Sequence, residues 1–172
     1  MQSERDSQRS AVYLWENLIR QQYPESDGVL ALDQCKELVA RVWCDYRPGH
    51  QPPTVHDGRG TRKARGGRWE INLPVWARRR LIVLHEIAHS LQTGGPWHGP
   101  HFATLALDLW EHYARVPREA RKIGIHLKPR RVHFAVAADI PQKKSAAWLR
   151  WNRTLESLKC QYDEHRKAEP ER

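Results

Sequence analysis

The sequence predicts an α+β fold: helices at the N-terminus, a small antiparallel sheet, a helix that carries the motif HExxH, and a basic helical tail. Two patterns support this prediction. Apolar residues recur at three- and four-residue spacing in four segments, which is typical of helices that bury one face. Between the second and third of these segments, short stretches of alternating apolar and polar residues lie among glycines, which is typical of strands joined by turns.

The first two helices are expected before residue 47. Residues 3–22 place Val12, Trp15 and Ile19 on one face, and Ser10 is a candidate cap. After a break at residues 23–28, the second helix is expected to begin with Asp33 as its N-cap.

A β-hairpin is expected next. Residues 54–56 read as its first strand, a basic turn with several glycines follows, and residues 68–73 (RWEINL) read as the returning strand. Pro74 suits the first turn of a helix, because its missing N–H is not needed there. That helix is expected over residues 74–93, a further helix over 100–115, and a short helix and turn within 117–125.

Composition bounds the domain organisation. The chain has 172 residues, of which 40% are hydrophobic and 28% charged, so we expect one domain with a sizeable core rather than wholesale disorder. We place the main domain at residues 1–127 and a basic extension at 128–172, with an amphipathic helix from Lys144 to Glu164. The net charge of +9 favours acidic partners, nucleic acid first.

The sequence also argues against several protein classes. The longest strongly apolar run, residues 81–84, is too short to cross a bilayer, and the polar N-terminus does not resemble a secretory signal. Cys35, Cys44 and Cys160 are odd in number and widely spaced, so reduced thiols are expected rather than a disulfide framework. We therefore expect a cytoplasmic protein that does not contact membranes.

The helix expected at 74–93 contains His85-Glu86-Ile87-Ala88-His89, an HExxH sequence. Four residues turn a helix by about 400°, so both imidazoles project from one face and can reach one Zn²⁺ at roughly 2.0–2.1 Å. Glu86 can then reach a zinc-bound water rather than the metal. Zinc lowers the pKa of such a water to about 7, and the carboxylate takes its proton as the water attacks a carbonyl.

A catalytic zinc site needs a third protein ligand and an open coordination position. His98 is the strongest candidate, because the glycine break at residues 94–96 turns the chain back toward the helix. His101 and Glu111 are alternative third ligands. Asp108 is a candidate for orienting a ligand imidazole, and the pair His112 and Tyr113 for binding an oxyanion.

The run HEIAH-x8-HGPHF resembles the SprT-like zinc metallopeptidases, whose pattern is HExxH, a variable loop and then HGxxF. In that family the three histidines bind zinc and the glutamate is the general base. The resemblance covers residues 68–115 and implies a zincin-like fold. It assigns the zinc ligands and the catalytic base to His85, His89, His98 and Glu86.

A second resemblance extends to the N-terminus. The sequences RDSQR (Arg5–Arg9) and VY (Val12-Tyr13), with DGRG and LPVWAR further on, are similar to a family of uncharacterised actinobacterial metallohydrolases, which adds support for the fold and names no substrate. The metzincin pattern is excluded, because Gln92 and Gly95 stand where it needs Gly and His. SprT-like proteins often carry a cysteine-based zinc ribbon, which Cys160 alone cannot build.

The basic hairpin is the best candidate for binding nucleic acid. Residues 47–80 contain nine Lys and Arg against two acidic residues. Glycines let a backbone approach phosphates, and arginines bind them bidentately. A solvated basic face without a partner is the alternative. The candidate DNA contacts are Arg59, Arg62, Lys63, Arg65 and Arg68.

The function expected from these patterns is a zinc-dependent metallopeptidase that acts on a protein or peptide and is associated with nucleic acid. Residues 69–73 are expected to form an edge strand that pairs with extended substrate backbone. One alternative is a zinc-dependent nuclease or other hydrolase acting on nucleic acid. The other is a non-enzymatic nucleic-acid-binding protein with structural zinc.

Overall fold

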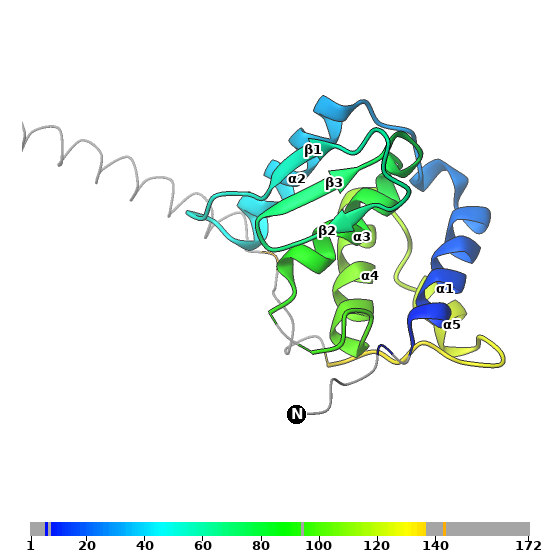
Figure 1. Cartoon of the computed structure of the whole chain (residues 1–172). Helices are drawn as coiled ribbons and strands as arrows, with labels where there is room; N and C mark the ends of the chain where they lie inside the picture. Colours follow the sequence, from blue (N-terminus) through cyan, green and yellow to red (C-terminus); the bar gives the residue numbers. More distant parts are fainter. Residues whose placement is uncertain (1–5, 7, 94, 137–142, 144–172) are drawn as a thin grey trace, which may run out of the picture.

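A computed structural model of the chain describes residues 6, 8–93, 95–136 and 143. These residues form an α+β structure with a three-stranded mixed sheet (Figure 1). The helices are α1 (Arg9–Gln22), α2 (Leu32–Tyr46), α3 (Arg80–Leu91), α4 (Pro100–Ala114) and α5 (Ala120–Ile125), with short 3₁₀ turns at Pro24–Ser26 and Val75–Ala77. The strands are β1 (Thr54–Asp57), β2 (Arg65–Gly66) and β3 (Glu70–Leu73).

Helix α3 lies at the centre of the fold. It packs on α2, on α4 and on strands β2 and β3. Every residue from Leu81 to Ala88 is buried, including His85 and Glu86. A helix that is apolar on nearly all sides is buried on all sides. The HExxH backbone is therefore fixed by packing from several elements at once.

Helix α1 packs against the core through Trp15. Trp15 packs on Trp110 of α4, with ring centroids 4.8 Å apart, and its indole N–H donates to the carbonyl of Ala120, 3.0 Å away. Helix α5 packs along α1 (Figure 1). Both tryptophans are fully buried, and this packing holds α1 close to the helices that follow the sheet.

The first two helices begin at other residues than expected. Helix α1 starts at Arg9, and the amide of Val12 donates to the carbonyl of Gln8, so Ser10 lies inside the first turn and is not the cap. Helix α2 starts at Leu32, one residue before the expected cap Asp33. The amide of Ala31 donates to the side chain of Gln34 instead, at 2.8 Å.

The helix expected over 74–93 is interrupted near Arg79, whose backbone is extended. Residues 78–80 form a short β-bridge with the loop at 28–30, through hydrogen bonds of 2.7 and 3.0 Å, and this bridge breaks the helix. Buried Asp27 then accepts the amide of Leu81 at 3.1 Å and pairs with Arg79 at 2.6 Å. A carboxylate at this place satisfies a free N–H of the first turn of α3.

The sheet differs from the expected antiparallel hairpin. Its order is β1–β3–β2, with β1 parallel to β3 and β2 antiparallel to β3. The prediction that residues 54–56 and 68–73 pair antiparallel is therefore wrong. The hairpin lies between β2 and β3, where the amide of Gly67 donates to the carbonyl of Glu70 at 2.8 Å.

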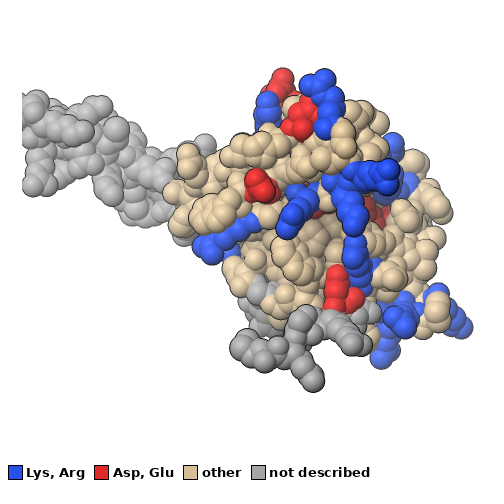
Figure 2. All heavy atoms as spheres, in the orientation of Figure 1, with Lys and Arg blue, Asp and Glu red and all other residues tan. Residues whose placement is uncertain are grey.

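The glycines expected in one turn serve two different connections. Gly58 lies where a Cβ atom would come within 2.5 Å of the amide nitrogen of Pro74, so the chain can cross from β1 to β2 only with glycine there. Gly66 and Gly67 belong to the β2–β3 hairpin. Lys and Arg side chains gather on the face between the sheet and α1 (Figure 2).

Helix α4 matches the expected range of residues 100–115 closely, and α5 lies within the expected 117–125. Val132 is buried, and its amide donates to the carbonyl of Gly124 at 2.8 Å. The helix expected over 144–164 lies outside the described residues, as does Cys160. No helix in the described part of the chain is long and apolar enough to cross a membrane.

Candidate metal centre

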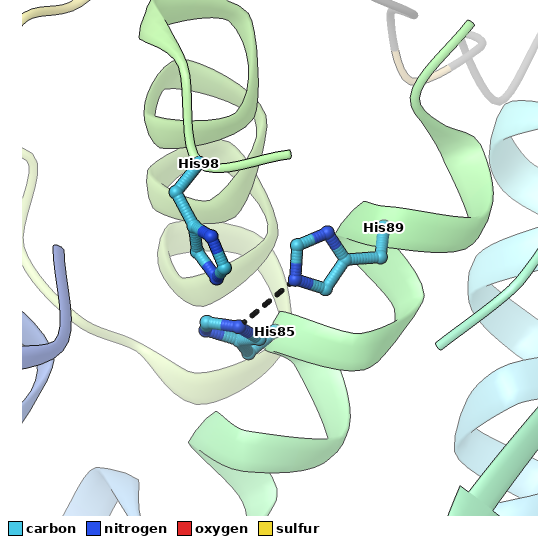
Figure 3. Close-up of side chains that lie close together, drawn as sticks. All are labelled: His85, His89 and His98. Carbon is cyan, nitrogen blue, oxygen red and sulfur yellow. Dashed lines mark hydrogen bonds between the residues drawn. The ribbon is translucent and has the colours of Figure 1, made fainter. Parts of the chain in front are cut away.

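Three imidazoles from two segments meet beside α3 (Figure 3). His85 and His89 lie one helical turn apart on α3, and His98 comes from the loop that leads into α4. One ring nitrogen from each of the three lies within 4.8 Å of the other two. Among the described residues with metal-binding side chains, this is the group that is close enough to hold an ion.

The distance between the two histidines of α3 suits a tetrahedral ion. The Nε2 atoms of His85 and His89 face each other at 3.1 Å. Two nitrogens that bind one Zn²⁺ at roughly 2.0–2.1 Å with a tetrahedral angle are about 3.3 Å apart. The two rings therefore need to move by only a few tenths of an ångström to share an ion.

His98 supplies a nitrogen that is buried and lacks a hydrogen-bond partner within the described residues. Its Nδ1 lies 2.7 Å from a carboxylate oxygen of Asp6, which leaves Nε2 directed toward the other two rings (Figure 3). A buried polar atom without a partner costs free energy. A metal ion between the rings would satisfy this atom, so the donor set fits Zn²⁺.

Two carboxylates from the N-terminal segment orient the imidazoles. Buried Glu16 of α1 lies 2.8 Å from Nδ1 of His85, and Asp6 holds both the ring and the backbone amide of His98. Such contacts fix the tautomer of a metal-binding histidine and raise its basicity. The sequence reasoning missed both residues, although Asp6 lies within the RDSQR motif that it singled out.

The candidate chosen for this orienting role, Asp108, lies elsewhere. Its carboxylate accepts a hydrogen bond from the hydroxyl of Tyr46 at 2.5 Å. Likewise, the hydroxyl of Tyr113 donates to Asp45, and Nδ1 of His112 bonds the carbonyl of Asp108. Asp108, His112 and Tyr113 thus make their contacts away from the histidine group, so the structure does not support their expected roles.

Burial and charge set the protonation of the rings. Burial, helped by the nearby His85 and His98, lowers the pKa of His89 to about 2. Burial also lowers the pKa of His98, although Asp6 opposes it. Burial alone would lower the pKa of His85, but the charge and hydrogen bond of Glu16 outweigh it and raise that pKa. Two rings are thus in the neutral form that binds metals, and a cation would displace the proton of the third.

Glu86 is buried beside His85, with 7% of its surface exposed. Burial raises the pKa of its carboxyl and nearby Glu16 adds to this, while His85 and a hydrogen bond from the backbone of Gly66 oppose it. Strand β2 runs very close to this residue, since a Cβ atom at Gly66 would lie 2.1 Å from the carbonyl oxygen of Glu86. A carboxyl with a raised pKa is better matched to accept a proton near neutral pH.

Aromatic rings enclose the group. Tyr13 of α1 is stacked parallel to His85 at 5.6 Å, and Trp97 packs on His89 at 5.2 Å. Phe102 contacts all three imidazoles at 4.3–5.0 Å between centroids. Because Phe102 is fully buried, its contacts restrict the orientations of the three imidazoles.

The structure separates the alternative ligands from the group. His101 is exposed on α4 and is not one of the three converging histidines. Glu111 pairs with Arg118 at 3.1 Å.

The edge strand expected over residues 69–73 is not at an edge. Most of it forms β3, which is the central strand of the sheet. The edge strand that lies against α3 is β2.

The five basic residues predicted to bind DNA have different immediate surroundings. Arg62 and Lys63 line a cleft of about 340 Å³ together with His85 and Glu86. Arg68 stacks on Trp69 at 5.0 Å, in a separate hollow. The remaining two are Arg59, which pairs with Asp57 at 2.6 Å, and Arg65, which is exposed on β2.

Replacing Glu16 with Gln is expected to lower zinc affinity about 10- to 100-fold, because the contact that orients His85 and raises its basicity loses its charge. Competition with a fluorescent zinc chelator measures this. Exposed Glu37 on α2 provides the matched control, since Glu37→Gln removes the same charge away from the site. Equal zinc affinity in wild type and Glu16→Gln would show that this contact does not tune the site.

In comparisons with protein families, with curated proteins and with solved structures, no match to this chain was found. The resemblance to SprT-like metallopeptidases therefore depends on the motif residues alone.

Proposed function

We propose that this chain is a zinc-dependent metallopeptidase. The observation that carries the proposal is the convergence of His85, His89 and His98, with His85 and the buried Glu86 lining an open cleft. The order of these four residues in the motif HEIAH-x8-HGPHF, which resembles SprT-like zinc metallopeptidases, supports it further.

The protein supplies orientation and proton transfer. Bound zinc would supply a Lewis acid that polarises a peptide carbonyl and lowers the pKa of water. Glu86 accepts the proton of the attacking water and passes it to the leaving amine. Glu16 and Asp6 hold the imidazoles in place during the reaction, and Gly66 lets β2 run close enough to bond the Glu86 carboxyl.

The carboxylates near the group disfavour a two-metal nuclease. Such an enzyme needs carboxylates to hold a second ion. Glu16 and Asp6 each already contact Nδ1 of a histidine. Glu86 is then the carboxyl that lines the cleft without a contact to a histidine ring.

The number of histidines disfavours a structural zinc site. Such a site is normally closed by four protein ligands. Among the described residues, three histidines lie close enough to share an ion, which favours an open site.

The proposal is tested with wild-type protein. We expect mass spectrometry to find about one zinc per chain, and unfolded casein to be hydrolysed. Chelation should abolish hydrolysis, and added zinc should restore it. Zinc-loaded protein that leaves casein and peptides intact but cuts labelled DNA or RNA would contradict the proposal and support the nuclease alternative.

A further inference from the structure

The cleft that His85 and Glu86 line also contains basic side chains. Helix α1 contributes Arg9 and Tyr13 to one wall, and the crossing from β1 to β2 contributes Arg62 and Lys63. His85 and Glu86 lie in the same wall lining. The cleft measures about 340 Å³, enough for a few side chains of a bound segment. Figure 2 shows Lys and Arg side chains crowding this face of the molecule.

Three of the cations in the cleft have no ion pair with any residue that the structure describes. Arg20 also lines the cleft, but it pairs with Asp27 at 2.7 Å. By contrast, no carboxylate of the described chain lies within ion-pair distance of Arg9, Arg62 or Lys63. Arg9 lies over the ring of Tyr13, 5.5 Å from its centroid.

The lining of the cleft contains four cations, Arg9, Arg20, Arg62 and Lys63, and two acidic residues, Glu16 and Glu86. Glu16 is buried against His85. Glu86 is also buried and lies beside the metal position. Unpaired cations that outnumber the acidic groups of a cleft create a positive potential that attracts an anionic ligand.

We propose that the cleft selects acidic peptides, with Asp or Glu side chains next to the scissile bond held by Lys63, Arg62 and Arg9. This inference rests on the proposed peptidase function and names its substrate class. The position of Glu86 favours a peptide over a nucleic acid. The group that reacts beside its buried carboxyl would be a neutral carbonyl in a peptide but an anion in a phosphodiester, which the carboxylate repels. The acidic side chains of the peptide would lie away from Glu86, against the three cations.

The test uses three fluorogenic peptides that differ only in the residues beside the cleaved bond: Asp and Glu, Asn and Gln, or Lys. We expect kcat/KM to be about 10-fold or more higher for the acidic peptide than for the neutral one, and to be lowest for the basic peptide. The preference should shrink as salt is raised, because the cations are exposed.

Charge reversal identifies the residues responsible. Lys63→Glu is expected to remove the preference for the acidic peptide and to improve cleavage of the basic one. Lys122 on α5 is exposed and lies outside the cleft, so Lys122→Glu is the matched control and should keep the preference. Circular dichroism of both variants confirms that the fold is retained.

Binding gives a second readout that does not require turnover. Fluorescence anisotropy of the labelled peptides on zinc-loaded Glu86→Gln should show the same order of affinities. Equal kcat/KM and equal binding for acidic and neutral peptides would overturn the inference while leaving the peptidase proposal intact. Tighter binding of a single-stranded oligonucleotide, lost in Lys63→Glu, would overturn it in favour of nucleic acid. If no peptide is cleaved, the peptidase proposal fails, and the anisotropy order still decides the charge preference.

Discussion

Replacing Glu86 with Gln is expected to keep zinc bound and to lower kcat by about 100-fold or more. General base catalysis contributes roughly 10²- to 10⁴-fold, and an amide cannot accept the proton of the attacking water. The amide has the same shape, and its oxygen can still accept the hydrogen bond from the backbone of Gly66. The measurement is kcat on a fluorogenic peptide together with zinc content by mass spectrometry.

The same substitution is expected to leave the metal-free protein as stable as the wild type, or more stable. The pKa of the Glu86 carboxyl is raised in the folded state, chiefly by burial, so its ionised form destabilises the fold once the pH exceeds the unfolded pKa. Gln is neutral at every pH and avoids this cost. Glu37→Gln, on the exposed surface of α2, should change neither kcat nor the melting temperature. Full activity in zinc-loaded Glu86→Gln would exclude Glu86 as the base.

The parts of the site that lie close together in sequence could be predicted from it. Helical periodicity alone puts His85 and His89 on one face, and the glycine break explains how His98 returns to them. In the structure, these three histidines do converge. Their spacing is a local property, since it depends on one helix and one short loop.

The carboxylates that orient the imidazoles could not be predicted in this way. Glu16 meets His85 across 69 positions of the sequence, and Asp6 meets His98 across 92. Their contacts depend on how α1 docks beside α3 and α4, which the packing of Trp15 on Trp110 determines. The N-terminal motif drew attention to the right segment, but only the docked helix shows what Asp6 does.

The pairing of the strands and the surroundings of the basic residues could not be predicted from the sequence either. The strand expected over 68–73 lies largely where predicted, but the amino-acid pattern does not tell whether β1 pairs with it parallel or antiparallel. That choice depends on the path of residues 58–64, which cross over to form β2. The crossing also brings Lys63 to the cleft lined by His85 and Glu86 and leaves Arg68 in a separate hollow. Five cations that are neighbours in sequence therefore face different surroundings.

Replacing His98 with Ala is expected to weaken zinc binding by more than the roughly 100-fold that the loss of an orienting partner can cause, because it removes a ligand itself. Two histidines on one helix would remain, and they cannot complete a tetrahedral site. Zinc content should fall from about one per chain to near zero after dialysis, and peptide hydrolysis should disappear with it. Mass spectrometry and competition with a zinc chelator measure the loss.

His101 is the matched control for this variant. It lies three positions further on, at the start of α4, but it is exposed and outside the histidine group. His101→Ala is expected to bind zinc as the wild type does. If His101→Ala bound zinc more weakly than His98→Ala, His101 would be the ligand instead. His98 also holds Asp6 through its ring. Melting curves of both variants in chelator therefore separate the loss of a zinc ligand from the loss of the contact with Asp6. A His98→Ala protein that melts normally without metal, yet fails to bind zinc, has lost a ligand rather than its fold.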